Sequence, residues 1–254
     1  MMKKYFIISL CCLGVLLLGY SLQGNQKNLE EEKLWTVGTN AEFPPYTYFE
    51  DGKIIGFDID IANEVCKRLG KDIKFVNMPF DALIPEVTME HVHFLAAGLS
   101  STEERAKKVL FTKPYLLEDP LVILTLKQQF HGEVKLEDLV GKTAVVNEGY
   151  TADLFLSSIK GLNLLRLTTP VDGFMALKNG RADAFITPKS TLNSFLSSQD
   201  KSLYGWSEIK GTAENCCLVA SKKHPGILEK IQSALDAMED DGTLTKLKTK
   251  WKLL

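Results

Sequence analysis

Short apolar runs alternate with amphipathic segments along most of the chain. Runs at residues 35–38, 72–76 and 92–97 have the length and composition of strands. Helices are expected between them, one beginning near Asp58 as its cap and one over residues 81–89. Strands that alternate with helices predict an α/β fold with mainly parallel sheets.

A second series of the same kind follows Pro120. Strands are predicted at Leu121–Leu126, 143–146, 162–167, 183–186 and 216–220, with helices at 152–158 and 171–178. The tail, residues 225–251, has helical periodicity that is broken at Asp241 and Gly242. The length of the chain allows the two series to form two separate cores.

The amino-terminal residues have a different composition. Lys3 and Lys4 precede an uncharged run of about 16 residues, shorter than the roughly 20 of a membrane-spanning helix. Small and polar residues follow, in the order typical of a secretory signal. We therefore expect a signal peptide over residues 1–24 and an exported protein. A permanent anchor, or a lipid on Cys11 or Cys12, is the less favoured alternative.

Charge and cysteine content narrow the possible partners. The 254 residues include 30 Lys and Arg against 32 Asp and Glu, so the chain has no excess of basic residues with which to bind nucleic acid. After the predicted leader, Cys66, Cys216 and Cys217 remain. An odd number with an adjacent pair predicts no disulfide framework.

No motif indicates a metal, a cofactor or a catalytic nucleophile. The segment Gly141-Lys142-Thr143 ends like a phosphate-binding loop, but Leu136 stands where the first glycine belongs. His91 and His93 have no neighbouring residues to complete a metal shell, so we expect surface or rim histidines. We therefore expect neither a cofactor nor a metal, and no catalytic residues.

Residues 98–105 combine a predicted helix start with an arginine. Thr102 is a natural cap, whereas Arg105 in the first turn opposes the helix dipole. Exposed amides together with a guanidinium suit a carboxylate. The alternative is a surface Arg105 paired with a neighbouring glutamate. A second helix start, at residues 149–151, would face the same anion if two lobes met there; otherwise it is an ordinary capped surface helix.

The loop after the first strand carries amide, acidic and aromatic groups. In α/β sheets ligands bind at this edge. Phe43 and Phe80 would suit a planar cation between them, with Glu42 or Asn40 accepting its N–H groups. Alternatively, Phe80 packs in the core and Glu42 is a solvated loop charge.

In this order and spacing, the motifs resemble the periplasmic amino-acid-binding proteins of ABC importers, solute-binding family 3. The matching segments are residues 37–39, 45–46, 56–60, 80–85, 98–105, 111–115, 240–244 and 250–251. Within the family, the chain is most similar to the arginine-binding ArtJ type.

This resemblance implies the two-lobed (type II) periplasmic-binding-protein fold with a two-stranded hinge. Lobe 1 would comprise residues 33–118 and 217–254, and lobe 2 residues 119–216. The hinge crossings would fall near residues 117–121 and 212–217. The implied protein is a monomeric receptor in the periplasm, or alternatively at the cell surface, that closes around a free amino acid, preferably arginine. It would deliver this ligand to the membrane permease of an ABC importer.

The resemblance also implies a ligand site. Arg105 would bind the α-carboxylate together with amides near Ser100 and Thr151, and the Gly98 carbonyl would accept from the α-ammonium with the Ser100 hydroxyl. Phe43 would contribute to the aromatic sandwich. The full implied site comprises Asn40, Glu42, Phe43, Phe80, Gly98, Ser100, Arg105 and Thr151.

One position departs from the family pattern. Five residues after Asp183, the family usually places an aspartate that neutralises the α-ammonium, but this chain has Pro188. A proline side chain accepts no hydrogen bond. Either Thr187, Ser100 and main-chain carbonyls suffice, or Glu148 approaches the ammonium.

Two other functions remain open at this stage. Some proteins with this fold are exported enzymes such as cyclohexadienyl dehydratases, in which Glu42 or Glu148 would serve as the acid. A surface adhesin or sensor built on the same lobes is the other alternative.

Overall fold

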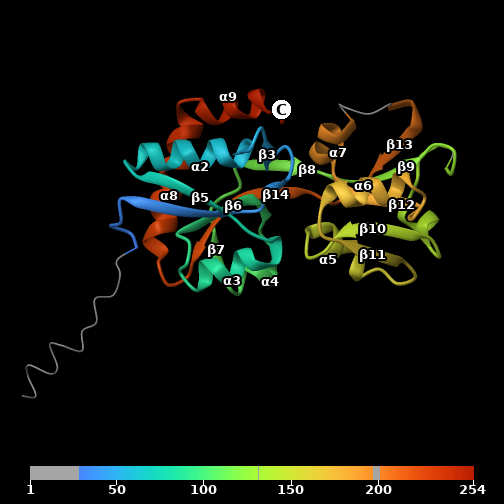
Figure 1. The fold of residues 1–254 in the computed structure, drawn as a ribbon, viewed down its shortest axis with the longest axis horizontal. Helices are drawn as coiled ribbons and strands as arrows, with labels where there is room; N and C mark the ends of the chain where they lie inside the picture. Colours follow the sequence, from blue (N-terminus) through green and yellow to red (C-terminus); the bar gives the residue numbers. More distant parts are fainter. Residues whose placement is uncertain (1–28, 131, 197–200) are drawn as a thin grey trace, which may run out of the picture. The chain divides into compact units, whose positions relative to one another are not determined.

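The computed structural model describes residues 29–130, 132–196 and 201–254 (Figure 1). The expected signal peptide, with Cys11 and Cys12, lies outside these residues. No helix in the described part of the chain has the length and apolar character needed to span a membrane.

The first sheet takes its strands from both ends of the described chain. Its order is β5-β1-β6-β14-β7, and β8 also pairs with β14. β1 is parallel to β5 and β6, whereas β14 is antiparallel to β6. The strands are β1 (Leu34–Thr39), β5 (Asp72–Asn77), β6 (Phe94–Ser100), β7 (Val109–Phe111), β8 (Leu116–Asp119) and β14 (Glu214–Ser221).

Helices cover the first sheet because both of its faces are apolar. Leu95, Leu99 and Val219 pack with Leu83 and Val87 of α3. α2 and α8 contact β6 and β14 respectively, and α2 lies across the sheet from α3 (Figure 1). The helices are α2 (Phe57–Arg68), α3 (Leu83–Thr88), α4 (Glu103–Ala106), α8 (Pro225–Asp240) and α9 (Thr243–Lys250).

The second sheet has the order β11-β10-β12-β9-β13. Alternate residues of β9 point to opposite faces, so Val122 and Leu124 join the core under α6 and α7, while Ile123 joins the core under α5. The elements are β9 (Leu121–Leu126), β10 (Thr143–Asn147), β11 (Asn163–Leu167), β12 (Ala184–Pro188), β13 (Tyr204–Glu208), α5 (Thr151–Ser157), α6 (Pro170–Lys178) and α7 (Lys189–Leu196).

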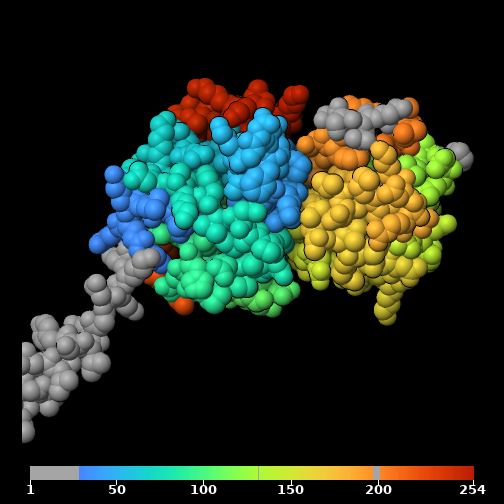
Figure 2. All heavy atoms as spheres, viewed as in Figure 1, coloured from blue at the N-terminus to red at the C-terminus, as the bar shows by residue number. Residues whose placement is uncertain are grey.

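Two chain crossings join the sheets. β8 leads into β9 through Pro120, and the chain returns from β13 to β14. β8 and β14 pair antiparallel, with Asp119 opposite Glu214. A small sheet of β2 (Glu42–Phe43), β3 (Thr47–Glu50) and β4 (Lys53–Ile55) lies beside the second sheet, where β2 contacts α6 (Figures 1 and 2).

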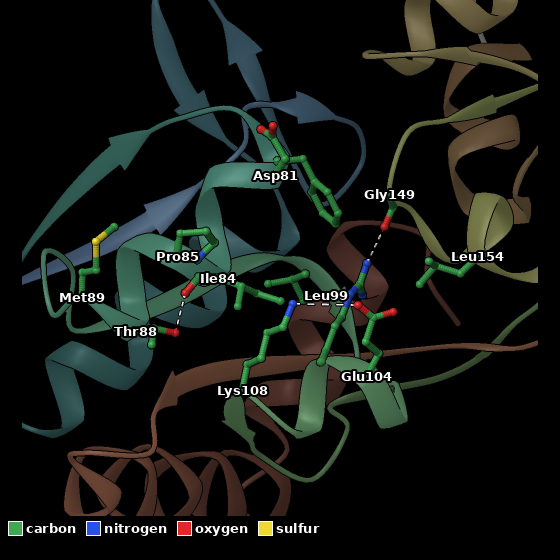
Figure 3. Close-up of a pocket in the computed structure, with 12 residues that line it drawn as sticks. Asp81, Ile84, Pro85, Thr88, Met89, Leu99, Glu104, Lys108, Gly149 and Leu154 are labelled. Carbon is green, nitrogen blue, oxygen red and sulfur yellow. Dashed lines mark hydrogen bonds and ion pairs between the residues drawn. The ribbon is translucent and has the colours of Figure 1, made fainter.

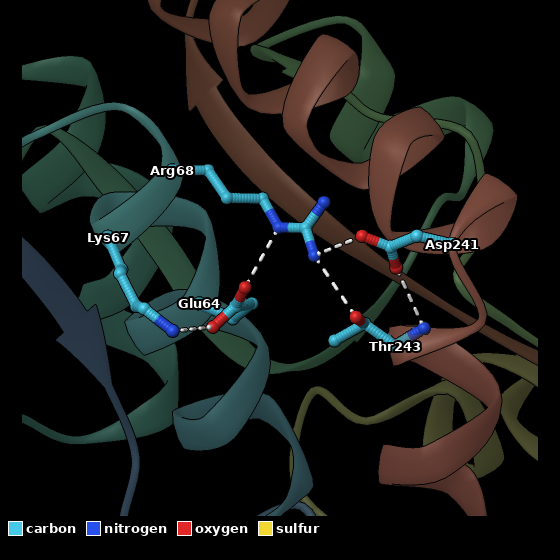
Figure 4. Close-up of polar contacts among 5 residues, drawn as sticks. All are labelled: Glu64, Lys67, Arg68, Asp241 and Thr243. Atoms are coloured by element: carbon cyan, nitrogen blue, oxygen red, sulfur yellow. Dashed lines mark hydrogen bonds and ion pairs between the residues drawn. The ribbon is translucent and has the colours of Figure 1, made fainter.

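The break in the carboxy-terminal helices is fixed by polar contacts (Figure 4). Gly242 has a φ of 74°, and the Asp241 carboxylate accepts from the Thr243 N–H at the start of α9 (2.9 Å). Arg68 at the end of α2 donates to Asp241 (2.7 Å), Thr243 (3.1 Å) and Glu64 (2.9 Å). These contacts attach α9 to α2, and they lower the pKa of Asp241 to about 2, with the bonds from Thr243 as the largest cause.

The α/β class and the predicted strands are confirmed, but two residue predictions were wrong. Asp58 is no cap: Gly56 is the N-cap of α2, and Asp58 lies buried inside the helix, where its carboxylate accepts from the Gly98 N–H. His93 is buried rather than at a rim, because the Thr36 N–H donates to its Nδ1 atom. The sequence pattern also gave no indication of β13, α7 or the small sheet.

Candidate functional site

Loops at the carboxyl ends of strands from both sheets bring polar and aromatic residues together. β1 leads into the segment with Asn40 and Phe43, and β6 leads into α4 with Arg105. On the second sheet, β10 leads into the start of α5. The residues around the small cavity between these loops, about 10 Å³ in volume, are Phe43, Phe80, Gly98, Arg105, Tyr150, Thr151 and Glu214.

Three aromatic rings form the apolar side of this cavity. The ring centroid of Tyr150 lies 4.2 Å from that of Phe80, at 35°, and 5.1 Å from that of Phe43, at 79°. The Tyr150 hydroxyl donates to Asn40 Oδ1 (3.2 Å). Tyr150 therefore fills the space between the two phenylalanines that the sequence predicts as an aromatic pair.

Arg105 is held by main-chain oxygens. Thr102 caps α4 by accepting from the Arg105 N–H, as predicted. The guanidinium donates to the carbonyls of Ser100 and Gly149, at 2.9 Å each, and lies 5.4 Å from the Phe80 ring centroid. The residue is 7% exposed, and desolvation lowers its pKa. Arg105 is therefore a buried cation bonded to two carbonyls, not a surface residue bonded to a glutamate.

Glu214 is the acidic residue of this cavity. It begins β14, is buried, and accepts a hydrogen bond from the Ser100 hydroxyl. Burial raises its pKa to about 7, against the opposing effects of the Ser100 bond and the nearby Arg105 charge. Sequence reasoning missed it. The signal available was a carboxylate two residues before a strongly apolar strand, at a predicted hinge crossing.

The residues that the sequence analysis considered around the α-ammonium, Glu148, Thr187 and Pro188, lie outside the cavity. Glu148 is exposed, and its N–H donates to the Leu167 carbonyl at the end of β11. Pro188 and Thr187 are buried in β12, paired with Leu121 and Val122 of β9. The cavity lining includes none of these three residues.

Asn40 and Glu42 are connected to the aromatic cluster by hydrogen bonds and do not line the cavity. Asn40 is buried and donates to the Met78 carbonyl (3.1 Å) and to Glu42 Oε2 (3.3 Å). Glu42 is exposed at the start of β2. The Glu42 carboxylate is therefore in hydrogen-bond contact with the residue that accepts from Tyr150.

Gly98 allows the close approach of Phe43. Its φ is 60°, and a Cβ atom at this position would fall 2.8 Å from Phe43 Cε1. Its N–H donates to Asp58 Oδ2 (2.6 Å), and burial raises the pKa of that carboxyl to about 6. A larger residue at position 98 would displace the Phe43 ring.

A larger groove of about 610 Å³ adjoins the cavity and shares Phe80 and Arg105 with it. Figure 3 shows its lining, with Ile84 and Met89 of the first-sheet side and Leu154 of α5. The residues in its lining are Phe80, Asp81, Ile84, Pro85, Thr88, Met89, Leu99, Glu104, Arg105, Lys108, Gly149 and Leu154.

A second polar cluster lies where the two sheets are joined. The hydroxyl of Tyr46 donates to Asp119 Oδ2 (2.6 Å) and lies 2.8 Å from the Ser190 hydroxyl. Ser190, in α7, donates to the same carboxylate through its hydroxyl (2.6 Å) and its N–H (3.0 Å). Asp119 of β8 therefore accepts from residues on both sides of the junction.

A family model, bacterial extracellular solute-binding proteins, family 3, matches residues 35–253. The chain belongs to this family. The expected two-lobed fold with a two-stranded hinge is confirmed. The solved structure of an ancestral arginine-binding protein bound to arginine has a TM-score of 0.81 and 32% identity, covering 87% of this chain and 98% of that one.

Two relatives extend the similarity along nearly the whole chain. The arginine-binding extracellular protein ArtP of Bacillus subtilis is 28% identical, over 98% of each chain. A probable histidine-binding protein of Campylobacter jejuni is also 28% identical, over 99% of this chain and 100% of the relative. These two relatives are therefore similar to the chain over nearly its whole length.

Proposed function

We propose that this protein is the extracytoplasmic receptor of an ABC importer and that it binds a free amino acid, preferably arginine. The observation that carries the proposal is the cavity where the Arg105 guanidinium and the Glu214 carboxylate lie beside the aromatic cluster. A cation, an anion and an aromatic surface correspond to the three parts of such a ligand, its carboxylate, its ammonium and its side chain.

Arg105 would bind the α-carboxylate. Its hydrogen bonds go to two neutral carbonyls, so neither bond neutralises the positive charge that would attract an anionic ligand. Burial strengthens this attraction because the local dielectric constant is low. The Thr151 amide at the start of α5 would add a donor from the second lobe, since the first amides of a helix have no partner within the helix.

Glu214 would bind the α-ammonium in place of the aspartate that Pro188 replaces. The carboxylate lines the same cavity as Arg105 and is already oriented by the Ser100 hydroxyl. Ser100 would then act through Glu214, and the Gly98 carbonyl would be a second acceptor. A buried carboxyl with a raised pKa gains a favourable partner when the ammonium arrives.

The aromatic cluster would hold the side chain. The faces of Phe43 and Phe80 suit a flat guanidinium, and Asn40 with Glu42 would accept its N–H groups. The name of the Bacillus subtilis relative supports arginine, whereas the Campylobacter jejuni relative names another basic side chain, histidine.

The remaining parts of the proposal concern domains, export and assembly. Lobe 1 would comprise residues 33–118 and 217–254, and lobe 2 residues 119–216. In support, the strands of the first sheet fall within residues 34–119 and 214–221, and those of the second within 121–208. A cleaved leader over residues 1–24 would release a monomer into the periplasm, where an ABC permease would receive the ligand.

Calorimetric titration with each of the twenty amino acids tests the proposal. The protein is first unfolded and refolded, which removes carried-over ligand. We expect submicromolar binding of arginine and binding of lysine that is at least about tenfold weaker, because an ammonium cannot stack as a planar guanidinium does. Tight binding of glutamine alone would overturn the arginine preference. Absence of binding by all twenty would overturn the receptor.

A further inference from the structure

Tyr150 occupies the place where a ligand side chain would stack. It is the N-cap residue of α5 in the second lobe, yet its side-chain contacts in the cluster, Phe43, Phe80 and Asn40, belong to the first lobe. The residue is 6% exposed. Beside it, the Gly149 carbonyl accepts from Arg105. The Tyr150 phenol and the Gly149 carbonyl thus contact the same protein groups that we propose as ligand-binding groups.

The space left beside the three rings is too small for a ligand side chain. A cavity of about 10 Å³ accommodates at most about one water molecule, whereas sites for small molecules have roughly 300 Å³ or more. Phe43, Gly98 and Asp58 are packed and hydrogen-bonded within the first lobe. The first-lobe side of the cavity is therefore held in place. Tyr150 begins a short helix and makes its ring contacts across the cleft.

We propose that the phenol of Tyr150 is an internal competitor, which occupies the side-chain subsite until an amino acid with a long side chain displaces it. This inference rests on the proposed function. The displaced contacts are two aromatic pairs and one hydrogen bond. Because these contacts must be lost before the ligand side chain binds, the apparent affinity equals the intrinsic affinity multiplied by the fraction of molecules in which the subsite is open.

The competition depends on the length of the ligand side chain. Arginine must pass its guanidinium between Phe43 and Phe80 and therefore removes Tyr150 completely. Alanine has no side chain that reaches between the two phenylalanines, so its binding at Arg105 and Glu214 requires the Gly149 carbonyl to leave Arg105 but does not require the phenol to leave the space between the rings. Tyr150 therefore reduces the advantage of long side chains over short ones.

Substitution of Tyr150 distinguishes a side chain that competes with the ligand from one that contacts the bound ligand. In Y150A we expect arginine to bind about tenfold more tightly, since each lost contact is worth a few-fold in affinity. Alanine binding should change less than about twofold. Y150F, which keeps the ring and loses only the bond to Asn40, should give a smaller gain. Y48A is the matched control, because Tyr48 packs on Trp251 away from the cavity.

Calorimetry of these variants has clear contrary results. Weaker arginine binding by Y150A would show that the phenol is part of the ligand's binding surface. Equal changes for arginine and alanine would show that it acts on closure alone and does not compete for the side-chain subsite. Either result overturns the proposal. Because Y150F keeps the packing, it provides the comparison if Y150A folds poorly.

A measurement without ligand tests Tyr150 independently of the proposed function. Small-angle X-ray scattering of the refolded protein gives its radius of gyration. We expect Y150A to be more expanded than the wild type and Y48A to match the wild type, because only the first variant loses contacts between lobes. An unchanged radius in Y150A overturns the proposal. If no amino acid binds but Y150A expands, the proposed function fails and the contact between lobes stands.

Discussion

Two arginines in this protein lie in opposite environments. Arg68 is half-buried at the surface and bonded to two carboxylates, Glu64 within α2 and Asp241, which connects α2 to the start of α9. Arg105 is buried and bonded to two carbonyls. The carboxyls differ in the same way: the pKa of Asp241 is lowered to about 2, and that of Glu214 is raised to about 7. The charges of Arg68 and Asp241 neutralise each other, as in a structural ion pair. Buried charges that are poorly compensated, as on Arg105 and Glu214, favour the binding of a ligand.

The largest expected effect is that of R105A. We expect a loss of roughly 100-fold or more in affinity for every α-amino acid that the protein binds, because the variant leaves the ligand carboxylate without its buried partner. Calorimetric titration measures this loss. R68A is the control and should bind as the wild type does. A loss for arginine alone would place Arg105 in the side-chain subsite.

The next effect concerns Glu214 and pH. Glu214 interacts with several neighbouring groups through a hydrogen bond or through charge. These groups are Ser100, Arg105, Asp119, Tyr150 and Cys216. Since the ammonium binds the ionised carboxyl, affinity should fall about tenfold for each pH unit below 7. E214Q should bind more weakly at pH 8 and lose this pH dependence. A wild-type affinity that stays constant from pH 5 to 8 would contradict the ammonium role.

Glu214 also has a predicted effect on folding. A carboxyl with a raised pKa binds its proton more tightly in the folded state, so the free energy of unfolding should decrease as pH rises from about 4.5 to 7. Asp58, with its pKa raised to about 6, acts in the same direction. Denaturation with urea measures this slope. E214Q should show a smaller decrease than the wild type. An identical slope would show that Glu214 does not contribute to the pH dependence of the free energy of unfolding.

A smaller effect is expected for E42Q. Glu42 is exposed and reaches the cluster through Asn40, so removal of its charge should weaken arginine a few-fold and leave glutamine nearly unchanged. Competition between the two amino acids in one titration measures the ratio directly. Equal losses for both ligands would place Glu42 outside the side-chain subsite.

The smallest effect is that of R68A on stability. An exposed ion pair contributes little to stability, so the midpoint of thermal unfolding should shift by only about a few degrees. Because the pKa of Asp241 is lowered in the folded state, its contribution is present above about pH 4 and is lost as pH falls towards 2. A loss of ligand affinity in R68A would contradict the assignment of a purely structural role to Arg68.

The sequence predicted the elements because their apolar periodicity is strong. Strand β9 coincides with its expected range, and the capped start of α4 placed Arg105 correctly in its first turn. Strand β13, with the exposed Trp206 and a glycine, lacks the apolar run that would identify it. Short or half-exposed elements depend on their neighbours rather than on their own pattern.

Parts of the candidate site were beyond sequence reasoning for a different reason. Glu214 lies more than a hundred residues from Ser100, and only the pairing of β14 with β6 brings them together. Tyr150 was considered only as part of a helix start, because no local pattern shows which ring enters a space on the other lobe. Contacts across the chain are set by topology and register, which a single sequence does not display.

The three cysteines of the described residues offer a practical use. Cys66, Cys216 and Cys217 are unpaired and buried, and burial raises the pKa of the Cys66 thiol to about 12 and that of Cys217 to about 11. Such thiols react slowly at neutral pH because the thiolate is the reactive form. A single cysteine introduced on the surface would therefore take a fluorescent dye selectively. The receptor is thus suited to serve as an optical sensor for its ligand without removal of these native cysteines.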